Sequence, residues 1–163
     1  MADSHSGGCQ CGAVRYRITG PLGHSGICHC RMCQKAGGKF GMVLLTTPVN
    51  QLEWTRGEAA EFSSTPVTVR GFCARCGTPL YMHEAGDVNY ELTVGSLDAP
   101  DIAPPVDEVG IESKRVWFDK ITTLPGHSTT DDRTPQELAR LVCRQHPDHD
   151  TDDCTHQDRN PTN

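Results

Sequence analysis

The hydrophobic and polar positions of this chain alternate in short stretches. Residues 13–19 alternate in this way up to a glycine, and residues 87–94 alternate again before a second glycine. A period of two places successive side chains on opposite faces of the backbone, so each stretch predicts a half-buried β-strand. Residues 39–47 carry a continuous apolar run that ends at Pro48. Because this run is short and bounded by helix breakers, it predicts a central strand rather than a helix.

The remaining hydrophobic stretches are also short, and they follow one another closely between glycines and prolines. They cover residues 51–55, 60–63, 67–72 and 116–118. Short strands in series predict a mainly β, antiparallel domain. A single helical turn is expected at residues 31–38, where two glycines end it. A long loop is expected at residues 99–109, which are rich in Pro, Asp and Ala.

The composition changes near His127, and we expect a domain over residues 1–127 with an extension over residues 128–163. The extension begins with Thr134-Pro135-Gln136-Glu137, a capping-box sequence with proline at the first helical position. It predicts a short helix over about residues 135–145. Beyond His146 the chain is polar and acidic, so a disordered tail is expected there.

Composition and charge narrow the class of protein. A chain of 163 residues, 36% of them hydrophobic, is large enough to bury one core. Its formal charge of -6 and the lack of a basic run argue against nucleic-acid binding. The first residues show no cationic segment followed by an apolar stretch, and no run approaches a membrane-spanning length. We therefore expect a cytoplasmic protein that binds neither nucleic acid nor membrane. The sequence leaves open whether the protein has a protein partner or forms a homo-oligomer.

Seven of the nine cysteines lie in three tight clusters: Cys9 and Cys11; Cys28, Cys30 and Cys33; Cys73 and Cys76. In a reducing compartment, such spacings favour metal sites over disulfides. A disulfide between two cysteines one residue apart would close a strained ring, whereas a Zn–S bond of about 2.3 Å lets both sulfurs face one ion. The clusters therefore predict bound zinc.

Several partitions of the seven thiols remain possible. One joins the two outer pairs into a four-thiolate site and leaves Cys28, Cys30 and Cys33 with a vacant fourth position on their ion. Another joins these three to one outside cysteine and strands the rest. We favour the first, because a balanced four-thiolate site would tie the first strand to a mid-chain hairpin and contribute to folding free energy.

The cysteine clusters and their surroundings resemble the glutathione-dependent formaldehyde-activating enzyme family, whose domain is shared with centromere protein V. The resemblance covers about residues 7–126. The matching motifs are Gly8-Cys9-Gln10-Cys11-Gly12-Ala13-Val14-Arg15-Tyr16, Cys28-His29-Cys30-Arg31-Met32-Cys33-Gln34-Lys35, Phe72-Cys73-Ala74-Arg75-Cys76-Gly77-Thr78-Pro79-Leu80 and Thr93-Val94-Gly95-Ser96-Leu97-Asp98.

This resemblance implies a single β-tent domain around two zinc positions. It also implies that Cys9, Cys11, Cys73 and Cys76 hold a structural zinc, and that Cys28, Cys30 and Cys33 hold a catalytic one. A zinc with three thiolates is a weak Lewis acid but is suited to binding a substrate thiol and removing its proton. The expected activity is that of a carbon–sulfur lyase acting on the adduct of a small thiol, such as glutathione as co-substrate, with an electrophile such as formaldehyde.

The alternative hypothesis is a non-enzymatic zinc module that binds a protein partner. It requires a fourth protein ligand beside Cys28, Cys30 and Cys33, for which His24, His29 and His83 are candidates. We expect His29 to point away, since it lies between two ligands in an extended segment. Arg31 and Lys35 could receive substrate carboxylates, but a solvated basic face is the more ordinary interpretation.

Five further side chains complete the predictions from the sequence. We expect Trp54, Trp117 and Phe118 to lie in the core or in the wall of a pocket, and we favour the core. Cys143, on the predicted C-terminal helix, is expected to be a small buried apolar residue, and Cys154 an uncoordinated thiol in the tail.

Overall fold

The computed structural model describes residues 3–152, whose strands form two sheets. The small sheet has the order β1 (Ser4–Gly8), β2 (Arg15–Thr19) and β5 (Leu52–Arg56). The large sheet has the order β10 (Asp107–Val109), β3 (Ser25–Cys28), β4 (Met42–Pro48), β9 (Asn89–Thr93), β8 (Pro79–Glu84), β7 (Thr68–Phe72) and β6 (Ala60–Ser63). Every pairing is antiparallel except that of β10 with β3. The predicted mainly β fold is confirmed.

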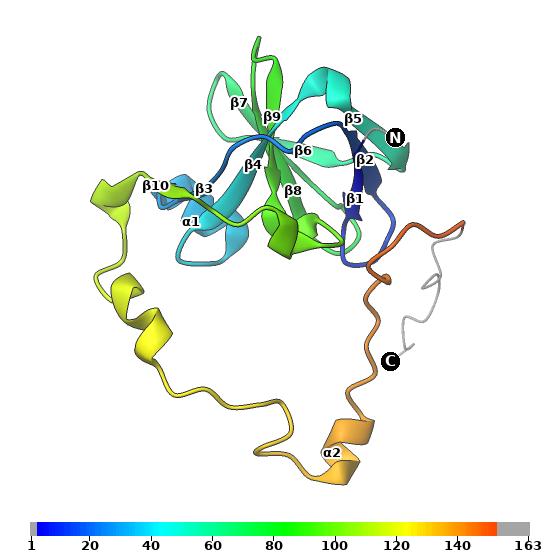
Figure 1. The fold of residues 1–163 in the computed structure, drawn as a ribbon, viewed down its shortest axis with the longest axis vertical. Helices are drawn as coiled ribbons and strands as arrows, with labels where there is room; N and C mark the ends of the chain where they lie inside the picture. Colours follow the sequence, from blue (N-terminus) through cyan, green and yellow to red (C-terminus); the bar gives the residue numbers. More distant parts are fainter. Residues whose placement is uncertain (1–2, 153–163) are drawn as a thin grey trace.

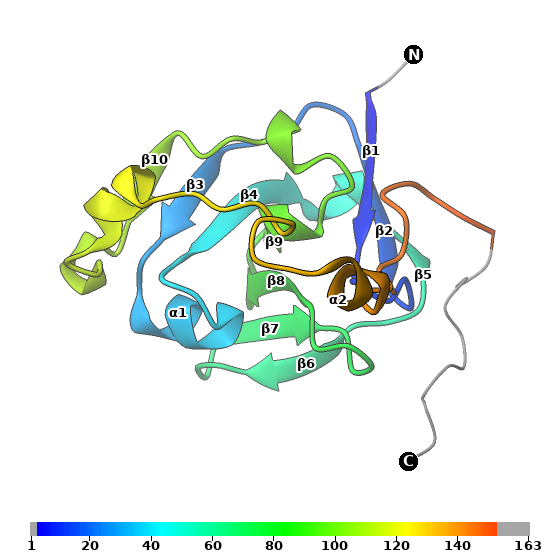
Figure 2. The same cartoon turned by 90° about the horizontal axis from the view of Figure 1, so that it is seen from below.

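The core lies where the two sheets meet, and Figure 2 shows the small sheet standing beside the large one. Its largest fully buried apolar side chains come from both sheets: Tyr16, Ile18, Leu45, Leu80 and Leu92. The apolar run that predicted a central strand forms β4, which lies between β3 and β9. This sheet therefore holds the ends of β3 and β7, which carry the cysteine clusters, in fixed positions.

The helices are short and lie outside the sheets. The α-helices are α1 (Arg31–Gly37) and α2 (Pro135–Ala139). The 3-10 helices are η1 (Val49–Gln51), η2 (Val94–Ser96), η3 (Pro100–Ile102), η4 (Ile111–Ser113) and η5 (Phe118–Thr123). The predicted turn after the second cysteine cluster is thus α1, which ends at Gly38 with a left-handed φ of 63°. None of the helices in the described part of the chain is long and apolar enough to cross a membrane.

The strand predicted at residues 116–118 is wrong. The chain there turns into η5, Val116 is 94% exposed and Trp117 is 50% exposed, so Trp117 does not belong to the core. Residues 116–118 pair with no described strand, and β3 takes β10 as its neighbour instead. β10 itself lies within residues 99–109, for which a loop was predicted. Its pairing partner is distant in the sequence, so local patterns do not reveal it.

The helix in the extension is shorter than predicted. The capping box at Thr134 is confirmed, but α2 ends at Ala139, and Cys143 is exposed rather than buried. Figure 1 shows the chain leaving the sheets after β10, passing through α2 and returning near β1 and β2. A helix of five residues in this projecting segment buries no side chain, which explains why it stops early.

Residues 147–152, which were predicted to be disordered, pack against the small sheet together with His146. The backbone N–H of His146 donates to the carbonyl of Gln10 at 2.7 Å, and His146 is 3% exposed. Asp150 pairs with Arg15 and Arg17, each at 2.9 Å. Two arginines on the same face of β2 therefore hold the acidic segment in place. Cys154 lies outside the described residues.

Candidate metal centres

The first cysteine group joins two turns that are far apart in the sequence. Cys9 and Cys11 follow β1, and Cys73 and Cys76 lie in the turn between β7 and β8. Their sulfurs all lie within 4.8 Å of one another. The Sγ atoms of Cys9 and Cys11 are 3.6 Å apart, and those of Cys11 and Cys73 are 3.8 Å apart. Tetrahedral zinc with Zn–S bonds of about 2.3 Å requires sulfurs about 3.8 Å apart, so this group fits the ion.

Backbone N–H groups donate hydrogen bonds to sulfurs of this group, an arrangement that favours thiolates. The N–H of Val14 donates to the Sγ of Cys9 at 3.3 Å, although burial still raises the pKa of Cys9. Burial would also raise the pKa of Cys76, but hydrogen bonds from the hydroxyl and N–H of Thr78 and from the N–H of Cys11 lower it to about 6. Four thiols this close together can all lose their protons only when a cation balances their charge. The geometry of the group suits such a cation.

The second group contains Cys28, Cys30 and Cys33, whose sulfurs also lie within 4.8 Å of one another. Cys28 ends β3, Cys30 caps α1, and Cys33 lies in the first turn of that helix. The Sγ of Cys30 accepts the N–H of Cys33 at 3.4 Å. Burial would raise the pKa of Cys30, but N–H groups of the helix and the two neighbouring thiols lower it overall. We call these three residues the cysteine trio.

A buried arginine contacts the cysteine trio. Arg70 of β7 is 7% exposed, and its Nη2 donates to the Sγ of Cys33 at 3.5 Å while its Nε donates to the Oγ of Ser64 at 3.1 Å. Sequence reasoning missed this residue. Arg70 shares the buried face of β7 with Thr68, whereas Val67 is 56% exposed. The apolar residues of this stretch therefore give no sign that the arginine points inward.

The histidines proposed as a fourth ligand all have other partners. His29 is fully buried, its Nε2 lies 3.4 Å from a carboxylate oxygen of Glu108, and its ring meets that of Phe118 edge-on. The ring of His24 pairs with Asp107, and Nδ1 of His83 lies 2.9 Å from the carbonyl of Asn89. Within residues 3–152, no fourth His, Cys, Asp or Glu places a ligand atom within 4.8 Å of all three sulfurs of the trio.

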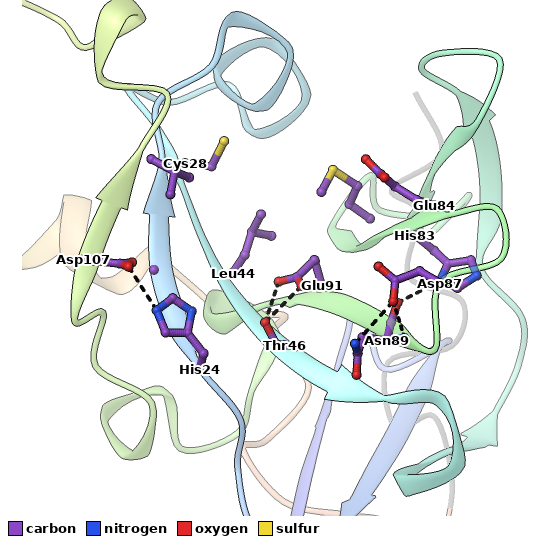
Figure 3. A pocket seen from close by; sticks show the side chains of 13 residues that line it. His24, Cys28, Leu44, Thr46, His83, Glu84, Asp87, Asn89, Glu91 and Asp107 are labelled. Atoms are coloured by element: carbon purple, nitrogen blue, oxygen red, sulfur yellow. Dashed lines mark hydrogen bonds and ion pairs between the residues drawn. The ribbon is translucent and has the colours of Figure 1, made fainter.

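A cavity of about 320 Å³ reaches the trio at Cys28. Its apolar wall consists of Leu44, Met82 and Val109, and most of its other lining residues are polar. Figure 3 shows Cys28 and Asp107 on one side, Glu84 and Asp87 on the other, and Glu91 between them. Arg31 and Lys35 do not line this cavity. The guanidinium of Arg31 instead donates to the side chain of Gln34 at 2.6 Å.

Two sheets that hold one four-cysteine group and one three-cysteine group define a small β-domain built around metal-ligating side chains. The fold is similar to that of a crystal structure of a Rhodobacter sphaeroides protein, with a TM-score of 0.52 and 20% sequence identity over 64% of this chain and 99% of that chain. This likeness concerns the fold alone.

The sequence comparisons are more specific. The pattern that defines the family "Glutathione-dependent formaldehyde-activating enzyme" matches residues 4–113. A Halomonas elongata protein, which provisionally bears that same enzyme name, is 28% identical over 123 residues, or 69% of this chain and 78% of the relative. The chain belongs to the glutathione-dependent formaldehyde-activating enzyme family.

Proposed function

We propose that this protein is a zinc-dependent carbon–sulfur lyase that forms and cleaves the adduct of a small thiol with formaldehyde or a similar electrophile. The observation that carries the proposal is the cysteine trio, which lacks a fourth protein ligand in the described chain and is reached by a cavity. The family name supports formaldehyde as the electrophile and makes glutathione the first thiol to test.

The proposed reaction is an addition without a change of oxidation state. The thiol sulfur forms a bond to the carbonyl carbon while the C=O double bond becomes a C–OH single bond. The proton lost by the thiol ends on that oxygen, so the product is an S-hydroxymethyl adduct. The reverse reaction breaks the same C–S bond and returns the proton to sulfur.

The residues of the trio would hold the ion and leave one side open to the cavity. A zinc bound there would supply a binding position for a thiol sulfur and lower the pKa of that thiol. Arg70 lies against Cys33 and offsets part of the negative charge of three thiolates. Leu44 and Met82 line the approach to Cys28 and would keep water from the reacting carbonyl.

The four-cysteine group would have a different task. Cys9 and Cys11 come from one turn and Cys73 and Cys76 from another, so an ion shared by them would fasten the small sheet to the large one. All four tetrahedral positions would be filled by protein sulfurs, which is typical of a structural zinc site. We therefore assign the fold-stabilising role to this group and the reaction to the trio.

Metal content and matched variants test the proposal. The purified chain should bind two zinc ions, and thiol–formaldehyde exchange followed by NMR should be accelerated by the loaded protein. Cys30→Ser should keep the fold, measured by circular dichroism, and lose the exchange activity. Cys73→Ser should instead unfold the protein. If Cys30→Ser unfolds the chain and no thiol alters either metal site, the protein is a structural zinc module.

A further inference from the structure

The polar lining of the cavity beside Cys28 is acidic. Four carboxylate side chains line it, and no lysine or arginine does; the carboxylates belong to Glu84, Asp87, Glu91 and Asp107. The imidazoles of His24 and His83 are the remaining titratable side chains there besides the thiol. A substrate that enters this cavity therefore meets a negative electrostatic potential on its way to the trio.

Most of this negative charge has no positive partner. Only Asp107 pairs with a base, His24, at 3.1 Å. The carboxylate of Glu91 accepts the hydroxyl of Thr46 at 3.0 and 3.2 Å. Asp87 accepts the backbone N–H of Asn89 at 2.9 Å and its side-chain amide at 3.3 Å. Within the described chain, Glu84, Asp87 and Glu91 form no ion pair.

The electrostatic state of Glu91 agrees with this description. Burial raises the pKa of its carboxyl, and the nearby charge of Asp87 raises it further, against the opposing effects of the Thr46 hydroxyl and of His24. A cation placed between Glu91 and Asp87 would relieve both effects. The net effect still disfavours the ionised carboxyl, so a cation brought by a bound molecule would stabilise the carboxylate of Glu91.

The spacing of these groups does not suit a metal ion. In residues 3–152, only the two cysteine groups bring three or more ligand atoms within 4.8 Å of one another. The carboxylates are spread around the cavity with Leu44 among them (Figure 3), and the apolar side chains of Met82 and Val109 also line it. Dispersed carboxylates with apolar surface between them suit an organic cation with a hydrocarbon body.

The arginine side chains near the trio have other hydrogen-bond partners. Arg70 is buried against Cys33 and Ser64, and Arg31 donates to Gln34. Neither lines the cavity, so neither is placed to receive the two carboxylates of a glutathione molecule bound there. Repulsion between the carboxylates of the cavity and those of a ligand weakens binding, so this lining selects against an anionic thiol.

We infer that the thiol accepted beside Cys28 carries a positive charge, such as an ammonium group, and is preferred over dicarboxylate glutathione. This inference rests on the proposed function, because it assumes that the cavity delivers a thiol to the trio. The sulfur faces Cys28, the hydrocarbon body contacts Leu44 and Met82, and the cation lies against Glu91 and Asp87. The bond changes are those of the proposed addition and are unaffected by the charge.

Three small thiols that differ mainly in charge test the inference: thiocholine, 2-mercaptoethanol and 3-mercaptopropionate. The quaternary nitrogen of thiocholine carries no N–H and cannot itself react with the aldehyde. For the zinc-loaded protein, kcat/KM for exchange with formaldehyde should be about tenfold or more higher for thiocholine than for 3-mercaptopropionate. The preference should shrink as salt is added, because salt screens the carboxylates.

Variants of the lining give the second arm of the test. Glu91→Gln and Asp87→Asn should lower the ratio of kcat/KM for thiocholine to that for 3-mercaptopropionate. Asp101→Asn removes an exposed carboxylate that does not line the cavity and should leave the ratio unchanged. Equal or greater activity with glutathione or 3-mercaptopropionate, with a ratio insensitive to Glu91→Gln, would overturn the inference.

Binding separates the inference from the proposed function. The cobalt-substituted protein reports thiol binding through its visible absorption, independently of turnover. If no thiol is turned over but thiocholine binds most tightly, the lyase proposal fails and the charge preference stands. If glutathione is turned over fastest, the lyase proposal stands and the charge preference fails. If no thiol changes the spectrum and none is turned over, both fail.

Discussion

The guanidinium of Arg70 donates a hydrogen bond to the sulfur of Cys33 across 3.5 Å, and both side chains are buried. The charge of this arginine therefore acts on the cysteine trio with little screening by water. The trio thus has a buried cation against one of its sulfurs.

Replacing this arginine should weaken metal binding at the trio alone. Arg70→Gln keeps a hydrogen-bond donor but removes the charge, so zinc affinity at the trio should fall about tenfold. Competition with a chromophoric chelator should then show one weakened ion and one unchanged ion. Lys35→Gln removes an exposed cation on the same helix as Cys33 and serves as the control. Equal weakening in both variants would mean that Arg70 has no specific role.

The two ion pairs of Arg15 predict different losses of stability when each aspartate partner is replaced. Arg15 binds Asp98 through two hydrogen bonds of 2.8 and 2.5 Å, with side chains 3% and 11% exposed, whereas Asp150 is 39% exposed. Asp98→Asn should lower the free energy of unfolding by about 3 kcal/mol. Asp150→Asn should lower it by about 1 kcal/mol or less. Urea unfolding of the zinc-loaded protein measures both, and equal losses would contradict the assignment.

The same pair predicts a pH dependence. Burial would raise the pKa of Asp98, but hydrogen bonds from Arg15 and Ser6 lower it below its usual value of 3.8. The folded state therefore binds this proton less readily than the unfolded state. The contribution of Asp98 is complete above pH 3.8 and is lost as the pH falls through the lower pKa of the folded protein. The difference in stability between the wild type and Asp98→Asn should shrink over that window.

Glu91 should show the opposite sign. Its pKa in the folded protein is raised above 4.5, first by burial and then by Asp87. Ionisation of Glu91 thus opposes folding, and stability from its protonated form is lost as the pH rises above 4.5 through the raised pKa. Glu91→Gln should be more stable than the wild type at pH 7 and lose this advantage at pH 4. Thermal unfolding at the two pH values measures the difference, and a variant less stable at pH 7 would refute the prediction.

The segment that returns to the small sheet should slow metal loss from the four-cysteine group. His146 and Gln145 line a cavity together with Cys9 and Cys76, and a Cβ atom on Gly12 would lie 2.1 Å from the His146 ring. His146→Ala should cost about 2 kcal/mol and speed zinc transfer to a chelator. His149→Ala, at an exposed position, is the matched control. Identical transfer rates in the two variants would show that the segment does not protect the site.

Much of the fold could be predicted because the relevant patterns are local. Alternation over a few residues marks β2 and β9, and an apolar run between breakers marks β4. The capping box at Thr134 acts within one helical turn, so it was visible in the sequence. The strand predicted at residues 116–118 was wrong because a strand also requires pairing with a neighbour, and no local pattern reports which segments pair.

The sequence by itself determined the composition of each cysteine cluster, since spacings of one or two residues place sulfurs within a single turn. Only the tertiary structure decided which turns meet, because the contact of Cys11 with Cys73 depends on how β2 and β7 are placed by two sheets. The inward turn of Arg70 and the meeting of Glu91 with Asp107 across one cavity have the same origin. Such contacts join residues far apart in the chain, and they arise from strand order and register rather than from sequence neighbours.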